Sequence, residues 1–87
     1  MARYRILIKT SAAKGLEAVD QKKHRQRIVS RIQSLAENPR PPGREKLSGQ
    51  GDKYRVREGH YRIVYSIEDE DRLVYVVKVG HRKDVYR

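Results

Sequence analysis

Hydrophobic and polar residues alternate along three stretches of the chain, and a period of two predicts β-strands. The stretches cover residues 3–9, 53–57 and 61–67. A fourth stretch, residues 73–79, is almost continuously apolar, which is typical of a central strand covered on both faces. The pattern therefore predicts one strand near the N-terminus and three strands together in the second half of the chain.

Between the first strand and the last three, apolar residues recur at helical spacing. Residues 12–19 predict a short helix, and residues 21–37 predict a longer one with an apolar stripe on one side. The second helix is expected to end before Pro39, because the residue preceding a proline is pushed out of the α region. From there to residue 51 we expect a loop. The candidate N-caps are Thr10, Ser11 and Asp20.

This order of elements predicts an α+β fold. We expect an N-terminal strand, a two-helix hairpin and three antiparallel strands, with the helices packed on one face of a four-stranded, mainly antiparallel sheet. A chain of 87 residues is expected to form one small domain spanning residues 1–87.

The charge of the chain indicates what kind of partner the protein binds. The chain has 21 Lys and Arg against 11 Asp and Glu, which gives a net charge of +10. Such a surface attracts polyanions, and nucleic acid is the commonest one in a cytosol. The absence of cysteine excludes a disulfide framework and favours a reducing compartment, and the longest apolar window, residues 73–77, is too short to span a membrane. We therefore expect a cytoplasmic protein with no membrane partner.

Three arginines form the first candidate site. Arg55 and Arg57 are two residues apart on one predicted strand and share a face, and Arg62 on the next strand joins them if the register is right. Guanidinium groups bind phosphate oxygens in pairs and stay charged at any biological pH. A phosphate site and an ordinary solvated outer face explain this spacing equally well.

The C-terminal tail forms the second candidate site. It carries an imidazole, a guanidinium, an ammonium group and a phenol in His81, Arg82, Lys83 and Tyr86. An imidazole can exchange protons near neutral pH, and a phenol can stack on an RNA base. The alternative is a basic terminus without a specific role. The other two histidines, His24 and His60, read as surface residues, and three scattered histidines without cysteine do not indicate a metal site.

Three segments of the sequence resemble the RelE family of toxins from toxin–antitoxin systems. They are KYRVR at residues 53–57, GHYRIVY at residues 59–65 and VKVGHRKDVY at residues 77–86. The resemblance implies a ribosome-dependent mRNA interferase, which cuts mRNA in the decoding site of the small subunit through attack by the RNA's own 2′-hydroxyl. It also implies that the protein needs no metal or cofactor. The implied partners are the ribosome, mRNA and a RelB-like antitoxin, and operator DNA is contacted only through the antitoxin complex.

The resemblance also assigns site residues. The implied catalytic set is Arg55, Arg57, Arg62, Arg82 and Tyr86. In addition to this catalytic set, the expected RNA-binding residues are Lys53, Lys83 and Arg87. RelE toxins often have lysines where Arg55 and Arg57 stand, and one such lysine has been considered the general base. Because arginine does not give up its proton, either His81 carries the proton or catalysis rests on charge stabilisation, with proton transfer to water or the ribosome.

Two other functions remain open from the sequence. One is a ParE-like inhibitor of DNA gyrase built on the same scaffold, which binds its target without cutting RNA. The other is a basic nucleic-acid-binding module without activity, whose binding would depend on total charge more than on any one arginine.

Overall fold

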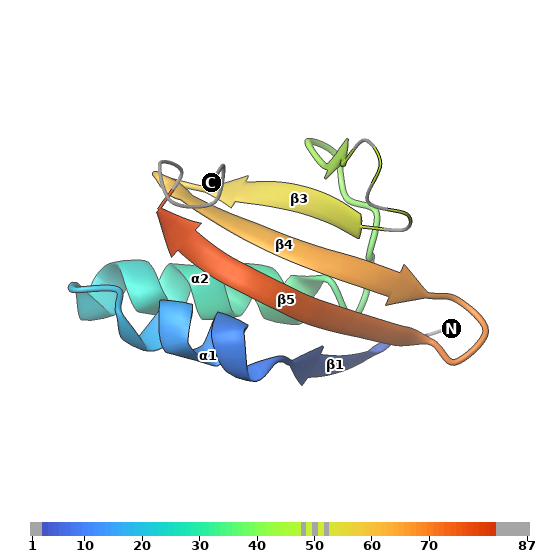
Figure 1. Cartoon of the computed structure of the whole chain (residues 1–87), viewed down its shortest axis with the longest axis horizontal. Coiled ribbons are helices and arrows are strands. Elements are labelled where there is room, and N and C mark those ends of the chain that lie inside the picture. The colour runs from blue at the N-terminus through green and yellow to red at the C-terminus, as the bar shows by residue number, and fades with distance from the viewer. Residues whose placement is uncertain (1–2, 48, 50, 52, 82–87) are drawn as a thin grey trace.

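The computed structural model describes residues 3–47, 49, 51 and 53–81. Two helices lie together on one side of a twisted sheet (Figure 1). In chain order the elements are β1 (Arg5–Ile8), α1 (Thr10–Glu17), α2 (Lys22–Ser34), β2 (Glu45–Lys46), β3 (Lys53–Glu58), β4 (Tyr61–Glu68) and β5 (Leu73–His81). Within these described residues, no helix has the length and apolarity that a bilayer crossing requires.

The sheet has five strands in the order β1-β5-β4-β3-β2. Strands β2 to β5 pair in antiparallel fashion, whereas β1 pairs with β5 in parallel. The α+β class and the mainly antiparallel sheet are confirmed, but the strand count of four was too low. The extra strand is β2, a two-residue segment too short to show any alternation, which pairs Glu45 with Arg55 and Lys46 with Tyr54.

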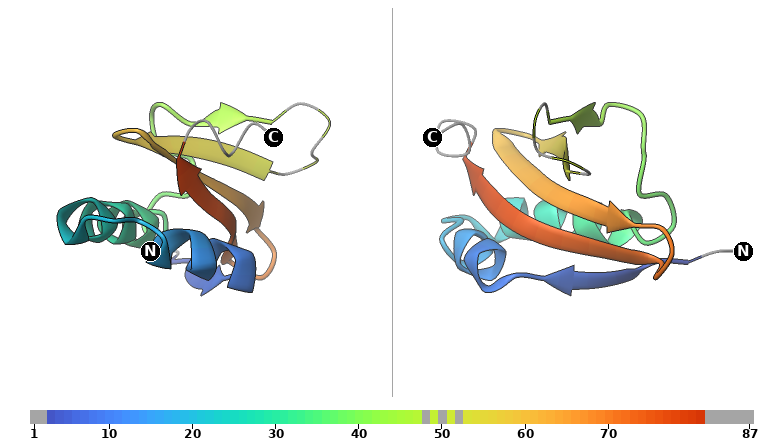
Figure 2. Two further views of the ribbon diagram at one scale, coloured as in Figure 1. Left: turned by 60° about the vertical axis from the view of Figure 1, so that its left-hand side comes forward. Right: turned by 45° about the vertical axis from the view of Figure 1, so that its right-hand side comes forward.

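The hydrophobic core lies between the helices and the inner face of the sheet, and the two further views of Figure 2 show both helices on that face. Its largest fully buried side chains include Ile28 from α2, Tyr65 and Ile63 from β4 and Val76 from β5. Burying apolar area is the main stabilising term for a domain of this size.

Helix α1 packs closely against β5. A side-chain carbon added at Gly15 would collide with the backbone carbonyl oxygen of Val79, so the helix can approach the strand only because this residue is glycine. Ser11 supports the same contact, since its Oγ donates a hydrogen bond to the Val77 carbonyl oxygen at 2.8 Å.

The helix boundaries differ from the prediction. Helix α1 begins at Thr10 rather than residue 12, and α2 ends at Ser34 rather than residue 37. Lys9 and Gln21 occupy the N-cap positions, and neither makes a side-chain capping hydrogen bond. These helices therefore depend on packing against the sheet more than on their caps.

Two polar contacts hold the loop after α2. The Tyr65 hydroxyl donates to the Pro39 carbonyl oxygen at 2.8 Å, and burial raises the pKa of Tyr65 to about 12. Nearby, Arg40 makes a bidentate pair with Asp69, at 3.1 Å and 2.8 Å, and Tyr4 donates to the same carboxylate at 2.6 Å. The loop is thereby tied to β4 and to the turn that follows it.

Candidate active site

The β3–β4 hairpin brings the three candidate arginines onto one face of the sheet. Arg57 lies directly opposite Arg62 in the register, and Arg55 lies two residues away on β3. Neighbouring core residues Val56 and Ile63 point towards the helices, so the alternation of the strands turns the arginines to the other face. We call Arg55, Arg57 and Arg62 the arginine row.

The three members of the arginine row differ in exposure. Arg57 is exposed, whereas Arg62 is only 6% exposed. The side chain of Arg55 is 12% exposed, and its guanidinium pairs with Glu45 at 3.0 Å. Like charges directly opposite each other destabilise a sheet, so the Arg57–Arg62 pair contributes nothing favourable to folding by itself. A bound anion such as phosphate would reverse the sign of that interaction.

Two lysines extend the arginine row on the same face. Lys53 begins β3 and continues the alternation of Arg55 and Arg57. Lys78 on β5 lies opposite Val64, which in turn lies opposite Arg55. The sequence did not single out Lys78, because the register shift between Val64 and Tyr65 leaves one extra residue in β5 and changes the phase of an otherwise apolar strand.

His81 lies outside the arginine row. It is the register partner of Tyr61, whereas Arg62 is paired with Gly80, so His81 belongs to the alternate row that faces the helices. Its ring contacts Tyr61 edge-on, with 5.7 Å between centroids, and stacks near His60 at 6.1 Å. The strand does not end at residue 79, where the predicted apolar stretch ends, because Gly80 pairs within β5 and the strand continues to His81.

The remaining candidates are Arg82, Lys83, Tyr86 and Arg87, and they lie outside the described residues. Within the described ranges, no group of three or more histidine, aspartate and glutamate side chains is arranged to hold a metal ion. The described part of the candidate site is therefore a cationic patch on an antiparallel hairpin.

Comparison with known proteins identifies the family. Residues 6–86 match the family described as the ParE toxin of the type II toxin–antitoxin system parDE. A RelE-like toxin protein of Escherichia coli is 33% identical over 88 residues, which cover 97% of this chain and 90% of that protein. The chain belongs to the RelE/ParE superfamily of toxins.

Other RelE proteins are similar to this chain in sequence and in fold. The mRNA interferase toxin RelE of Escherichia coli K12 is 34% identical over 61 residues, covering 68% of this chain and 63% of that protein. The RelE–RelB complex of Pyrococcus horikoshii matches with a TM-score of 0.80 and 32% identity, covering 94% of this chain and 97% of that chain. The isolated RelE toxin of Escherichia coli matches with a TM-score of 0.77 and 29% identity, covering 95% and 90%. The resemblance noted in the sequence is thus confirmed, and this chain has the RelE fold.

Proposed function

We propose that this protein is the toxin of a type II toxin–antitoxin module and acts as an mRNA interferase in the decoding site of a translating ribosome. The observation that carries the proposal is the direct opposition of Arg57 and Arg62, with Arg55 beside them on the same face. Its support from relatives is the Escherichia coli RelE protein, which is named an mRNA interferase.

The arginine row suits cleavage by the RNA's own 2′-hydroxyl. In this reaction the 2′-oxygen forms a bond to the adjacent phosphorus while the bond to the 5′-oxygen breaks, leaving a 2′,3′-cyclic phosphate and a 5′-hydroxyl. Negative charge builds up on the phosphoryl oxygens in the transition state, and fixed guanidinium groups stabilise it. Arg55, Arg57, Arg62 and Arg82 would supply this charge, and Tyr86 would hold a base by stacking. Because substrate and protein provide both nucleophile and charge, the proposed reaction needs no metal or cofactor.

Proton transfer is the second part of the proposal. The proton of the 2′-hydroxyl needs an acceptor, and the leaving 5′-oxygen needs a donor. The guanidiniums of the arginine row are effectively always protonated and are poor acceptors. His81 is the candidate acceptor, although its place beside Tyr61 puts it in the alternate row. The other route is transfer to water or to a ribosomal group.

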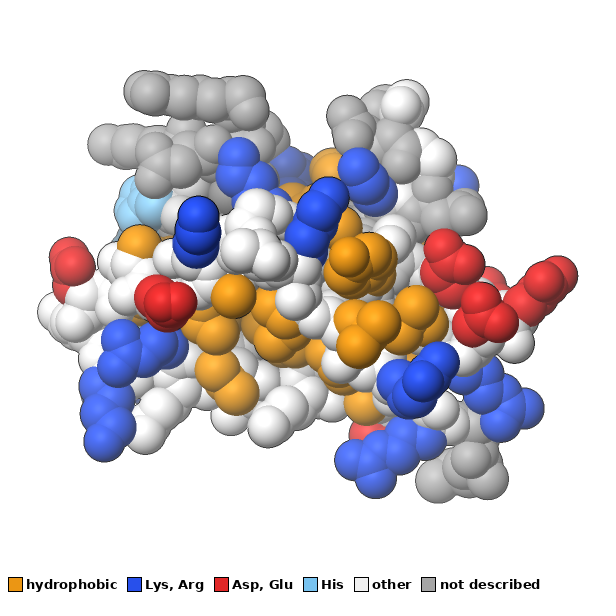
Figure 3. Space-filling model, turned by 60° about the horizontal axis from the view of Figure 1, so that its bottom comes forward, with side chains coloured by type: hydrophobic (Ala, Val, Ile, Leu, Met, Phe, Trp, Pro, Cys, Tyr) orange, Lys and Arg blue, Asp and Glu red, His pale blue; other side chains and the backbone are white. Residues whose placement is uncertain are grey.

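A RelB-like antitoxin would neutralise this toxin. The support is the fold match to a RelE chain solved in complex with RelB. The β1 edge of the sheet offers a docking place, since Leu7, Ile8 and Tyr75 are exposed there at 49%, 44% and 37%. Figure 3 shows hydrophobic side chains gathered in the middle of one face, with lysines and arginines around them. In this proposal, operator DNA is contacted only through the antitoxin complex.

The test is cleavage on programmed ribosomes, mapped by primer extension. We expect Arg57→Ala to slow single-turnover cleavage by about 100- to 1,000-fold, the usual effect of removing one transition-state donor. Arg82→Ala and Tyr86→Ala test the tail in the same assay. Lys14→Ala removes an exposed cation from α1, away from the site, and is expected to cleave at the wild-type rate.

Two further variants separate the roles within the site. Arg62→Lys keeps the positive charge but loses the planar guanidinium group that binds two phosphate oxygens at once. Because Arg62 is buried, the thermal unfolding of this variant is measured alongside its cleavage rate. His81→Gln should flatten the rising limb of the pH–rate profile if the imidazole is the base, and should leave it unchanged if water or the ribosome accepts the proton. Equal cleavage by wild type, Arg57→Ala and Arg82→Ala would remove the assigned site.

The family match also favours a second candidate function. The matching family is described as the ParE toxin, and a ParE-like protein on this scaffold would inhibit DNA gyrase without cutting RNA. A gyrase supercoiling assay with the purified protein separates the two. Inhibition of supercoiling together with intact mRNA on ribosomes would favour the gyrase inhibitor.

A further inference from the structure

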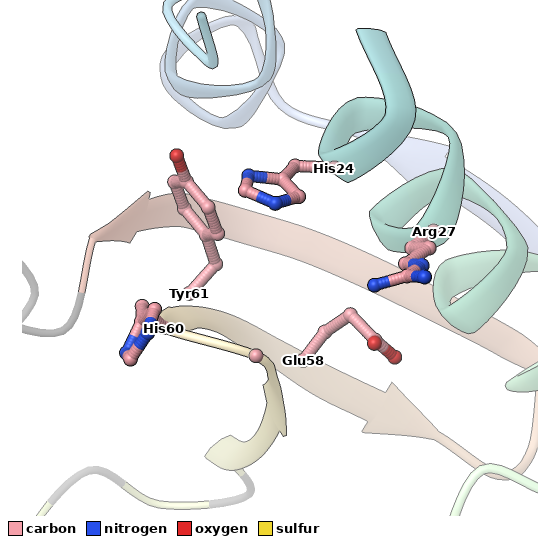
Figure 4. Close-up of a pocket in the computed structure, with 6 residues that line it drawn as sticks. His24, Arg27, Glu58, His60 and Tyr61 are labelled. Atoms are coloured by element: carbon pink, nitrogen blue, oxygen red, sulfur yellow. The ribbon is translucent and has the colours of Figure 1, made fainter. Parts of the chain in front are cut away.

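A small pocket lies on the other side of the same hairpin. It has a volume of about 220 Å³ and is formed between α2 and the β3–β4 turn, with His24, Arg27, Glu58, Gly59, His60 and Tyr61 as its lining (Figure 4). Glu58 and Tyr61 are the immediate neighbours of Arg57 and Arg62 along the chain. The pocket and the arginine row therefore lie on the two opposite faces of one hairpin.

The pocket gathers aromatic rings. The chain has three histidines, and all three lie near Tyr61 at this end of the sheet. The centroid of the His24 ring is 5.9 Å from that of Tyr61, and His60 and His81 stack at 6.1 Å. Histidine and tyrosine rings are among the surfaces on which single-stranded RNA bases stack.

Two charged side chains from opposite walls face the same pocket. Figure 4 shows Arg27 extending from α2 and Glu58 from β3 into the space between the helix and the strand. The ion pairs within the described ranges are Arg3–Glu37, Arg40–Asp69 and Arg55–Glu45, so neither Arg27 nor Glu58 is engaged in one. The pocket thus presents a two-oxygen acceptor and a guanidinium donor beside its rings.

Size and chemistry together indicate the ligand. Sites for drug-sized molecules measure about 300–1,000 Å³, so this pocket suits a single planar group. Guanine has two adjacent N–H donors, N1–H and N2–H, that match the two oxygens of one carboxylate. It also carries the O6 and N7 acceptors that arginine binds in pairs. The other RNA bases do not offer two neighbouring N–H donors on separate nitrogens to a single carboxylate.

The surface beside the pocket continues with phosphate-binding groups. A second groove, of about 570 Å³, shares Arg27 and Glu58 with the pocket and runs along α2 past Lys23, Ser30 and Arg31. Lys23, Arg27 and Arg31 are four residues apart, so they form one stripe with about 6 Å between successive positions along the helix. Such a stripe can follow the phosphates of an RNA strand whose base enters the pocket.

We infer that this pocket binds an unpaired guanine of RNA, with Glu58 on the N1–H and N2–H edge, Arg27 on the acceptor side and His24, His60 and Tyr61 as stacking surfaces. The inference extends the proposed ribosomal function, because it adds an RNA contact away from the arginine row. The guanine belongs either to mRNA beside the cleavage position or to ribosomal RNA.

The first test uses the free protein and needs no ribosome. Chemical-shift titration with GMP, AMP, CMP and UMP should show signals of the pocket residues moving, with GMP binding about tenfold to a hundredfold more tightly than AMP. Glu58→Gln should abolish this preference, because an amide offers one acceptor oxygen instead of two. Glu68→Gln, an exposed carboxylate at the other end of β4, is the matched control and should keep the preference.

The second test locates the guanine. Kethoxal modifies N1 and N2 of unpaired guanines, so the occupied guanine should be protected in the ribosome complex of the wild type and reactive with Glu58→Gln. Protection of an mRNA position or of a ribosomal position identifies the source.

Equal affinity for the four nucleotides, or an unchanged preference in Glu58→Gln, would overturn the guanine site. Because the titration involves no cleavage, a negative result there leaves the ribosomal assay of Arg57→Ala unaffected. Guanine binding by a protein that fails to cut mRNA would instead count against the proposed function alone.

Discussion

Asp69 joins three parts of the chain through one carboxylate. Arg40 donates two hydrogen bonds to it and Tyr4 donates a third, and these bonds hold the pKa of Asp69 at about 2, below the ordinary value of 3.8. A carboxyl group whose pKa is lower in the folded state stabilises the fold above its unfolded pKa. This contribution is lost as the pH falls through the folded value.

The expected result is a pH-dependent difference between wild type and Asp69→Asn. The wild type should unfold at a higher temperature at pH 6, and the difference should shrink as the pH falls from about 4 to about 2. Thermal unfolding followed by circular dichroism at several pH values measures it. Glu70→Gln, in the same turn, is the control and should show no such convergence, and a constant difference between wild type and Asp69→Asn would contradict the assignment.

At the scale of single residues, the sequence predicted which arginines share a face of the sheet, but not the burial or the ion-pair partner of each arginine. The alternation of residues 53–57 and 61–67 is enough to place Arg55, Arg57 and Arg62 together, because strand side chains point to opposite faces in turn. The burial of Arg62 and the ion pair of Arg55 with Glu45 depend on strand register and on β2. The local alternation of polar and apolar residues predicts neither the burial of Arg62 nor the ion pair of Arg55.

At the scale of elements, the contact between α1 and β5 gives a sharp prediction. In an exposed helix, Gly→Ala stabilises by about 1 kcal/mol, but at Gly15 the added carbon meets the Val79 carbonyl oxygen. Backbone cannot move aside without shifting β5, so we expect Gly15→Ala to lower the free energy of unfolding by about 1–3 kcal/mol. Urea denaturation measures the change.

The control for this prediction is Lys14→Ala, the neighbouring exposed position in α1. Its midpoint in urea should stay within the range usual for surface substitutions, about 0.5 kcal/mol. An increase in stability for Gly15→Ala would show that the helix can move away from the strand.

Long periodic elements were predicted, and short or irregular ones were not. Strands β3, β4 and β5 were recognised from alternation or from their apolar run, whereas β2 has two residues and no pattern. The apolar stretch predicted a strand ending at residue 79, but Gly80 pairs with Arg62 inside β5. Glycine weakens a strand without forbidding it, and here the neighbouring pairs of β4 keep the strand continuous.

At the scale of the whole molecule, the exposed apolar side chains of β1 and β5 lie on different strands from the arginine row. Leu7 and Tyr75 are register partners at the β1 edge, and both are exposed. The arginine row lies across the sheet on β3 and β4. An edge strand with exposed apolar side chains is a template for an added strand or helix from a partner.

We therefore expect Leu7→Ser combined with Tyr75→Ser to weaken binding of the cognate antitoxin by about tenfold or more, because both side chains lose buried apolar area. Cleavage on ribosomes without antitoxin should stay at the wild-type rate. Calorimetry with the purified antitoxin measures the affinity, and Arg3→Ala, an exposed residue near the same edge, is the control. Unchanged affinity of the double variant would place the antitoxin elsewhere.

The parallel pairing of β1 with β5 has a consequence for synthesis. Within the described residues, residues 5–8 pair with residues 73–76, so β1 cannot join the sheet until these much later residues have been synthesised. Contacts so distant along the sequence form slowly, because the entropy cost of closing a long loop comes before the favourable energy of the contacts. We therefore expect β1 to join the sheet late in folding, after the neighbouring antiparallel strands β3, β4 and β5 have paired.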